Sequence, residues 1–420
     1  MRIIELKDIK VEKNLINYYY EVSEELVHFF QEEERFFIEY PVEYDFSDVP
    51  YSVLAIPFVM NLLPLAWVSD SLIKVSELDE SFYHSLAGVK AGFCKIHNPE
   101  ILNGGVEYRE LVNNDYVPSE ESCLLFSGGV DALSATINHI DKHPVLINIW
   151  GADIRLSNIE LHNEMEKELK DLAGKFNLEY FYIKSSLRFF IKEQELEREF
   201  GSIIHDTWWH GMQHSIGMLS LLAPYDYIRK CKYNIIAASF TPASYIDKVS
   251  GKIIPCSNYP FIDEKLANVT TKIIHDGFDL KRIEKIRDIV NYSKEKAISI
   301  HLKVCFHPIK GQNCSRCEKC YRTIIGIYAL GEDPSRFGFE FNKKVLRKIK
   351  RFLSLNILGD TVVTLWMEIS DYLKAHHSNP KCKWFIDYKF NTGNVFYKRI
   401  YLKLRMLARR TVDKLRRNKC

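Results

Sequence analysis

A serine, two glycines and an aspartate, Ser127, Gly128, Gly129 and Asp131, directly follow an apolar run in this 420-residue chain. A helical pattern of apolar residues begins at Asp131, so the segment predicts a buried strand that turns through glycines into a helix. The first N–H groups of such a helix lack partners and its dipole is positive there, so the turn can bind an anion. Glycines admit a phosphate, Ser127 adds a hydroxyl, and Asp131 caps the helix or holds Mg²⁺. The segment predicts a phosphate-binding turn, with an ordinary strand-to-helix turn as the alternative.

Four cysteines farther along the chain form a second group with chemical potential: Cys305, Cys314, Cys317 and Cys320. They are separated by eight, two and two residues, and four thiolates spaced in this way can close the tetrahedral shell that structural zinc prefers. An iron–sulfur cluster is the runner-up, and unligated cysteines are the remaining alternative. The other cysteines are scattered without pattern, which suits a reducing compartment and makes disulfides the weakest option. The pattern predicts a bound zinc ion and a cytoplasmic protein.

The glycine-containing turn resembles the signature of the PP-loop ATP pyrophosphatases, Ser-Gly-Gly-x-Asp-Ser. Members of that superfamily bind ATP on the loop, cleave it between the α and β phosphates, and adenylate a substrate. The resemblance implies that ATP and Mg²⁺ bind here, with Ser127 and Asp131 in catalytic roles; the implied binding residues are Ser127, Gly128, Gly129, Val130 and Asp131. No lysine follows the glycines, so the segment is not a P-loop. Ala132 stands where the family has its second serine, so one phosphate-facing hydroxyl is missing.

Together, the turn and the cysteine group resemble the corresponding motifs of the 7-cyano-7-deazaguanine synthases. The resemblance implies that this chain is a divergent member of that family. The four zinc cysteines of that family have this order and similar spacing. Residues 254–262 are a weaker echo of the family's substrate segment, whose two acids and arginine are not reproduced here. The resemblance covers roughly residues 121–331, about half of the chain.

This resemblance implies an ATP-dependent ligase that acts on a small-molecule carboxylate. The carboxylate attacks the α phosphate, pyrophosphate leaves, and a nitrogen nucleophile converts the adenylate into an amide or a nitrile. No glutaminase-type pairing of cysteine and histidine is evident in the sequence, so free ammonia or a partner must supply the nitrogen. Two alternatives stay open: a nucleotide-binding sensor or assembly subunit with weak or no catalysis, and a sulfur transferase acting on a nucleotide or tRNA. The transferase needs a catalytic thiol, for which Cys123 and Cys256 are the candidates.

Three histidines, His205, His210 and His214, lie in an aromatic segment. His210 and His214 share a helix face at a spacing of four residues, which can bind a metal. The tryptophans and methionines around them favour a packed helix, so structural or substrate-contacting histidines are preferred to a second metal. His205 and Asp206 are expected to face the nucleotide pocket.

The middle of the chain alternates strand and helix patterns. Strands are expected at residues 123–126, 145–150, 178–183, 233–238 and 302–306, and helices at 131–140, 159–176, 208–222, 283–292 and from about 321. This rhythm predicts an α/β fold with a Rossmann-like parallel sheet, and the resemblance implies the adenine nucleotide alpha hydrolase type. Ligands of such folds lie at the carboxyl ends of the strands, where Ser127 would be. In the family the second strand holds the adenine, which implies residues 147–150 here.

The regions on either side complete a division into three parts: an N-terminal α+β region at 1–119, the ATP-binding domain with its zinc knuckle at 120–331, and a helical, basic C-terminal region at 332–420. Residues 51–68 are apolar, but Pro57, Asn61 and Pro64 interrupt them, so buried strands or loop are expected in preference to a membrane span.

Residues 397–419 are strongly basic and have an amphipathic pattern, so this tail could rest on an anionic membrane or a nucleic-acid backbone, or dock on the protein as a solvated helix. The net charge of +2 argues against nucleic acid as the partner of the whole molecule. A small-molecule substrate is expected, and a homodimer and a peripheral membrane location remain open.

Overall fold

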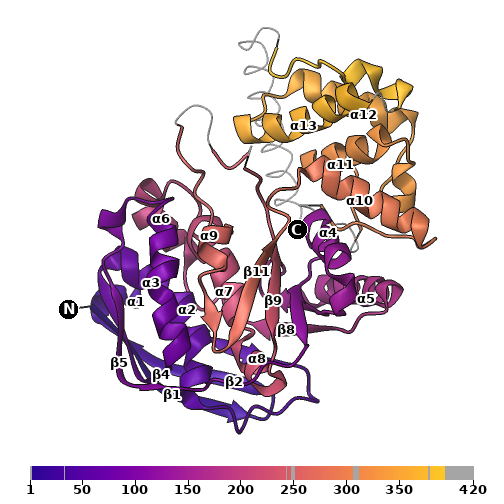
Figure 1. The fold of residues 1–420 in the computed structure, drawn as a ribbon. Helices are drawn as coiled ribbons and strands as arrows, with labels where there is room; N and C mark the ends of the chain where they lie inside the picture. Colours follow the sequence, from indigo (N-terminus) through magenta and orange to yellow (C-terminus); the bar gives the residue numbers. More distant parts are fainter. Residues whose placement is uncertain are drawn as a thin grey trace, which may run out of the picture. The chain divides into compact units, whose positions relative to one another are not determined.

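The computed structural model describes residues 2–32, 34–242, 244–246, 251–305, 312–376 and 379–392, except for the Thr361 side chain. The basic tail at 397–419 lies outside these residues, so its predicted helix remains a prediction. The chain divides into two compact units, Met1–Leu280 and Lys281–Cys420 (Figure 1).

The first unit is built on an 11-stranded sheet in the order β10-β11-β9-β6-β7-β8-β3-β2-β1-β4-β5. Most neighbouring strands in it run parallel. The protein is therefore of the α/β class, as expected, with a mixed sheet. The strands are β1 (Arg2–Glu12), β2 (Leu15–Val22), β3 (Phe37–Glu39), β4 (Ser71–Asp79), β5 (Gly105–Val112), β6 (Ser122–Leu125), β7 (Val145–Trp150), β8 (Tyr180–Ser185), β9 (Tyr233–Ala237), β10 (Ala267–Asn268) and β11 (Thr271–Asp276).

Five parallel strands, β8-β7-β6-β9-β11, form the half of the sheet that carries the candidate nucleotide loop. The first of them along the chain, β6, lies in the middle: the next two strands add on one side and the last two on the other. This is the Rossmann order, and the reversal of direction beside β6 is a topological switch point. All four residues of β6 are buried, as expected for a strand covered on both faces. The expected strands at 123–126, 145–150, 178–183 and 233–238 are confirmed within two residues.

Residues 1–119 add strands to this same sheet. The link is an antiparallel pair in which Ile38 of β3 faces Ser185 of β8. The segment was expected as a separate region because its patterns are mixed, but strand pairing between distant segments leaves no local sequence signal. The helices of the first unit are α1 (Glu24–Val27), α2 (Tyr51–Ser69), α3 (Glu80–Phe93), α4 (Val130–Asn138), α5 (Ile159–Phe176), α6 (Glu193–Ile204), α7 (His214–Ser220), α8 (Ala223–Arg229) and α9 (Pro260–Asp263), with a π-helix at Trp209–Gln213.

The apolar segment expected as strands or loop is instead the buried helix α2. It is long and apolar enough to cross a membrane by length and composition, and 94% of its apolar window is buried in the protein. Pro57 and Pro64 remove hydrogen bonds inside the helix, and Asn61 donates to the Pro57 carbonyl oxygen at 2.9 Å. The sequence prediction of strand or loop was wrong because packing on all sides outweighs the local penalty of two prolines.

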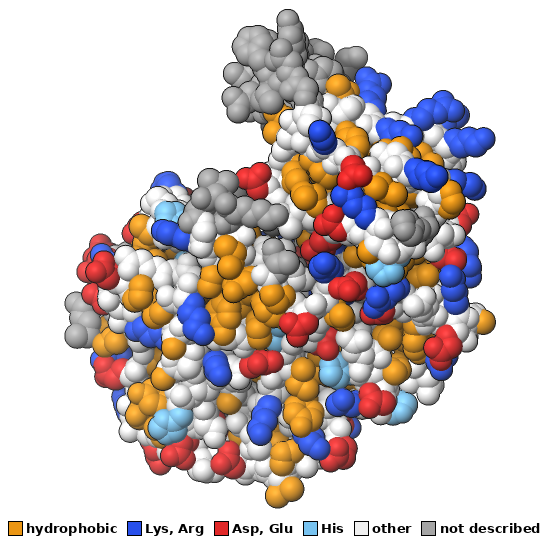
Figure 2. Space-filling model, turned by 45° about the horizontal axis from the view of Figure 1, so that its top comes forward, with side chains coloured by type: hydrophobic (Ala, Val, Ile, Leu, Met, Phe, Trp, Pro, Cys, Tyr) orange, Lys and Arg blue, Asp and Glu red, His pale blue; other side chains and the backbone are white. Residues whose placement is uncertain are grey.

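The second unit is helical. It contains α10 (Arg282–Glu295), α11 (Glu318–Ala329), α12 (Lys343–Leu355) and α13 (Asp360–His376). The predicted strand at 302–306 is wrong for residues 302–305, which are irregular; Phe306 lies outside the described residues. Lysines and arginines gather on the surface of this unit (Figure 2). In α12 the lysine and arginine side chains are exposed, whereas Val345, Ile349 and Leu353 are buried.

Candidate functional site

The segment that follows β6 has the geometry of an anion-binding turn. Gly128 has a φ of 68°, which favours glycine, and Gly129 occupies the N-cap position of α4. Ser127 is exposed, and its Oγ accepts a hydrogen bond from the Gly129 N–H at 3.3 Å. Asp131 is in the first turn of α4 and is not its cap, so the capping role expected for it is wrong. A carboxylate at this position still suits the positive end of the helix dipole.

The sheet fixes the start of the turn. Phe126, which directly precedes Ser127, donates its N–H to the Ile147 carbonyl of β7 at 2.7 Å. Its own carbonyl accepts from the Asn148 side chain at 2.9 Å. The structure therefore places Ser127, Gly128, Gly129 and Asp131 at the carboxyl end of β6, at the switch point, where ligands of such sheets bind. Ala132 is 5% exposed, and its side chain is a methyl group, so this position adds no polar group to the turn.

The end of β7 carries an aromatic stack beside this edge. Trp150 stacks on His162 of α5 with ring centroids 3.7 Å apart and an interplanar angle of 5°. Lys184 Nζ lies 5.3 Å from the Trp150 ring. Burial, and then the nearby Lys184 charge, lower the pKa of His162 to about 4, so this imidazole is neutral near pH 7. One face of Trp150 is thus already occupied by His162.

The four predicted metal ligands come together in the second unit, with all four sulfur atoms within 4.8 Å of one another. Cys305 Sγ lies 3.9 Å from Cys317 Sγ, and Cys314 Sγ lies 4.0 Å from Cys320 Sγ. A tetrahedral zinc ion with bonds of about 2.3 Å holds its sulfurs roughly 3.8 Å apart, so the group fits zinc closely. Cys317 is the N-cap residue of α11 and Cys320 lies in its first turn.

Local hydrogen bonds connect the segments that carry these cysteines. The Cys314 N–H donates to Cys305 Sγ at 3.3 Å. The Asn313 side chain donates to the carbonyls of Leu302 and Gly338 and accepts from the Val304 N–H, which ties both cysteine segments together. A hydrogen bond with Cys317, then burial and then repulsion from the other thiolates raise the pKa of Cys320. A dication would reverse this effect, so the site suits a metal better than four free thiols.

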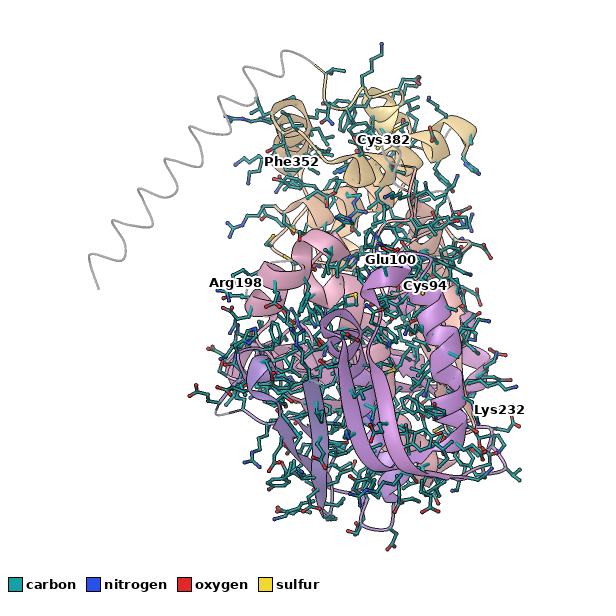
Figure 3. All side chains as sticks on the ribbon, turned by 90° about the vertical axis from the view of Figure 1, so that its left-hand side faces the viewer. Cys94, Glu100, Arg198, Lys232, Phe352 and Cys382 are labelled. Carbon is teal, nitrogen blue, oxygen red and sulfur yellow. The ribbon has the colours of Figure 1, made fainter. Side chains whose placement is uncertain are left out.

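Among the residues that the structure describes, the other cysteines do not join this group. Cys382, labelled in Figure 3, is buried in the 3₁₀ helix Pro380–Phe385 of the second unit, and Cys94 caps the end of α3. Cys123 lies at the amino end of the parallel strands, fully buried and 3.8 Å from Cys231. Burial raises the pKa of the Cys123 thiol. These features disfavour Cys123 as the thiol of a transferase at the carboxyl edge.

The structure brings together side chains that the sequence analysis did not connect. The Asp206 carboxylate contacts His210 Nδ1, and the Ser257 N–H donates to the His210 carbonyl at 2.9 Å. Within the described residues, no set of three metal-ligating side chains includes His210 or His214, and the structural or substrate-contacting role preferred for them remains a prediction. His205 is the C-cap residue of α6, with a φ of 58°.

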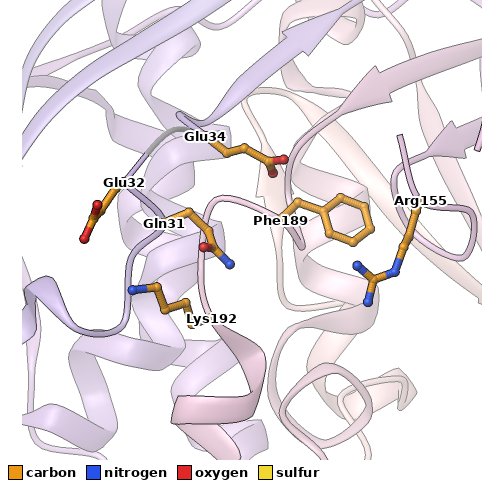
Figure 4. Close-up of a pocket in the computed structure, with 6 residues that line it drawn as sticks. All are labelled: Gln31, Glu32, Glu34, Arg155, Phe189 and Lys192. Atoms are coloured by element: carbon orange, nitrogen blue, oxygen red, sulfur yellow. The ribbon is translucent and has the colours of Figure 1, made fainter. Parts of the chain in front are cut away.

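A pocket of about 360 Å³ lies beside the loop that follows β7 (Figure 4). Its lining carries both signs of charge around one aromatic ring, and the Arg155 guanidinium lies 5.8 Å from the Phe189 ring centroid. None of its residues was singled out from the sequence, because they come from segments far apart in the chain: Gln31, Glu32, Glu34, Arg155, Phe189 and Lys192.

No protein-family model matches the chain, and no curated protein matches it.

Proposed function

We propose that this protein binds ATP with Mg²⁺ on the turn at residues 127–131 and transfers AMP to a small-molecule carboxylate, releasing pyrophosphate. The observation that carries the proposal is the position of this turn: it follows the central strand β6 at the switch point of a Rossmann-ordered sheet. The motif residues resemble the PP-loop of ATP pyrophosphatases, which supports cleavage between the α and β phosphates.

The chain's own groups would act as follows. The N–H groups at the start of α4 face the phosphates, and the helix dipole adds positive potential there. Ser127 would contribute a hydroxyl, and Asp131 would hold Mg²⁺, which would supply positive charge against the leaving pyrophosphate. Zinc at the four cysteines has a structural role, because a shell of four protein sulfurs leaves no open position for a substrate. A nitrogen nucleophile then displaces AMP from the adenylate to give an amide, and loss of water from the amide would give a nitrile.

One observation favours a second function, that of a nucleotide-binding sensor or assembly subunit. Ala132 replaces the second serine of the PP-loop motif, and its buried methyl group cannot contact a phosphate through a hydrogen bond. Such a protein would bind ATP without turning it over.

An ATP–pyrophosphate exchange assay with a panel of carboxylates, including 7-deazapurine acids, tests the proposal. We expect carboxylate-dependent exchange, with AMP and pyrophosphate as products. ATP binding without exchange for any acid would favour the sensor, and production of ADP and phosphate would contradict the proposal. Asp131→Asn serves as the matched variant, since it removes the charge and keeps the shape.

A further inference from the structure

We propose that Cys123, Cys231 and Asp226 form a second metal site, a buried structural site for zinc. The three ligand atoms, two Sγ and one carboxylate oxygen, all lie within 4.8 Å of one another. Thiolate sulfur and carboxylate oxygen are both ligands that zinc takes in proteins. The inference does not rest on the proposed ATP chemistry, because this group lies at the amino end of β6 and the glycine-containing turn follows its carboxyl end.

The fold brings the ligands together from two distant segments. Cys123 lies in β6, Asp226 lies in α8, and Cys231 lies between α8 and β9. The Cys231 N–H donates to the Asp226 carbonyl at 3.0 Å, which closes the turn after α8. Strand β9 pairs with β6, and Asn234 lies opposite Cys123 in that ladder. The strand pairing thus holds Cys123 beside the turn that carries the other two ligands.

The separation of the two sulfur atoms fits a shared zinc ion. Cys123 Sγ lies 3.8 Å from Cys231 Sγ. A tetrahedral zinc ion with bonds of about 2.3 Å holds two sulfurs roughly 3.8 Å apart. In the four-cysteine group of the second unit, two sulfur pairs lie 3.9 and 4.0 Å apart. The pair in the first unit therefore has the same spacing as the group whose sequence pattern predicts zinc.

The Asp226 carboxylate differs from the other buried aspartates. Asp79, Asp226 and Asp263 are each 0% exposed. Both carboxylate oxygens accept hydrogen bonds in Asp79 and in Asp263, and His275 also contacts Asp263. In Asp226, by contrast, Oδ1 has no hydrogen-bond partner within the part of the chain that the structure describes. Burial of an uncompensated carboxylate is costly, and coordination to a metal is one way in which proteins compensate it.

Two asparagines give Asp226 the outer contacts that orient a metal-binding carboxylate. Asn234 Nδ2 donates to Asp226 Oδ2 at 2.6 Å, and Asn268 Nδ2 donates to the same oxygen at 3.0 Å. Such hydrogen bonds fix the orientation of a ligand, and here they leave Oδ1 for the ion. The amide oxygens of both asparagines also lack hydrogen-bond partners among the described residues. They are the candidates for the fourth ligand.

The burial of the group indicates a structural role. Cys123, Cys231 and Asp226 are all 0% exposed, whereas a catalytic zinc ion keeps one position open to water or substrate. The turn is covered further by Thr271, whose Oγ1 donates to the Cys231 carbonyl at 2.9 Å. An ion bound here would link β6 to α8 and to the start of β9. Because its ligands are buried, it would enter as the chain folds, with release of the two thiol protons.

Elemental analysis of the full-length protein from zinc-replete medium tests the site. We expect about two zinc ions per chain, one here and one at the four-cysteine group. Cys231→Ala and Asp226→Asn should each lower the content by about one ion, as Cys317→Ser should at the other group. Cys94→Ala, a change at a cysteine of the first unit outside the site, should keep both ions.

The outcomes separate the two groups. A single zinc ion in wild type that is lost in Cys317→Ser and kept in Cys231→Ala would overturn the inference. A single ion with the opposite behaviour would support the inference and contradict the four-cysteine assignment. Neither result depends on ATP, so the proposed adenylation stands or falls separately.

A change in the core can also unfold the protein, so a second measurement leaves the site intact. X-ray absorption at the zinc edge of Cys317→Ser protein reports the ligands of the remaining ion. We expect about two sulfur neighbours, with oxygen completing the shell. A shell of three or more sulfurs would place the ion at the remaining cysteines of the other group and overturn the inference. So would a disulfide between Cys123 and Cys231, detected in wild type by peptide mass spectrometry without reductant.

Discussion

The Asn148 side chain donates a hydrogen bond of 2.9 Å to the carbonyl of Phe126, the last residue before the glycine-containing turn. Phe126 is 1% exposed, so its carbonyl has little access to water as a substitute partner. The position of the turn thus depends on a side chain of the neighbouring strand β7.

We expect Asn148→Leu to destabilise the fold by about 1–3 kcal/mol, because it leaves a buried acceptor unsatisfied. The same change should weaken ATP binding, since Ser127 is the next residue. Urea denaturation and titration calorimetry measure the two effects. Asn113→Leu, at an exposed position of the same unit, should change neither. Unaltered ATP affinity in a destabilised Asn148→Leu protein would separate the loop from nucleotide binding.

Asp131→Ala should weaken the binding of Mg·ATP and leave the fold nearly intact. The residue lies in the first turn of α4, where loss of a carboxylate from the helix dipole costs about 0.3–1 kcal/mol. Calorimetry with and without Mg²⁺ measures the effect: the variant should lose the part of the affinity that depends on magnesium. If the magnesium dependence stays as in wild type, Asp131 is not the metal ligand.

The parallel half of the sheet could be predicted from the sequence because each of its elements carries a local signal. The 145–150 strand and the 159–176 helix were predicted at the residues where β7 and α5 occur. The joining of β3 to β8 could not be predicted, since it pairs segments almost 150 residues apart. The helix α2 was missed for another reason: its prolines suggested an interruption, and only the surrounding core makes a helix the favourable state.

Some contacts of the candidate site can likewise be predicted from the sequence, and others cannot. Cys314, Cys317 and Cys320 are close in the sequence, so their spacing predicts that they form one group, and in the structure their sulfur atoms lie together. Ser257 and His210 are 47 residues apart and meet only through the tertiary fold, so no spacing could reveal their contact. The sequence places Asp206 at the start of a predicted helix and so suggests the nucleotide pocket, whereas in the structure its carboxylate contacts His210 Nδ1.

The four-cysteine group should hold about one zinc ion per chain. Cys317→Ser should lower both the zinc content and the Tm, because an incomplete shell holds the ion less tightly and structural zinc contributes directly to folding. Elemental analysis and thermal denaturation provide the measurements. Cys382→Ser, a change at another buried cysteine of the same unit, should leave the zinc content unchanged. Iron and sulfide in place of zinc, or the absence of any metal, would contradict the assignment.

The last prediction concerns the stability of the protein at alkaline pH. Burial alone would lower the pKa of His210, but with the hydrogen bond to Asp206 this pKa is raised from 6.5 to about 10. Between these two pH values the folded state keeps a proton on His210 that the unfolded chain has lost. The resulting stabilisation is fully present below pH 6.5 and disappears as the pH rises through about 10. The free energy of unfolding of wild type should therefore fall over this interval more steeply than that of His210→Gln, and Asp206→Asn should reduce the slope. Urea denaturation at pH 6, 8 and 10 measures it. Parallel curves for wild type and His210→Gln would show that the charged pair is not formed in solution.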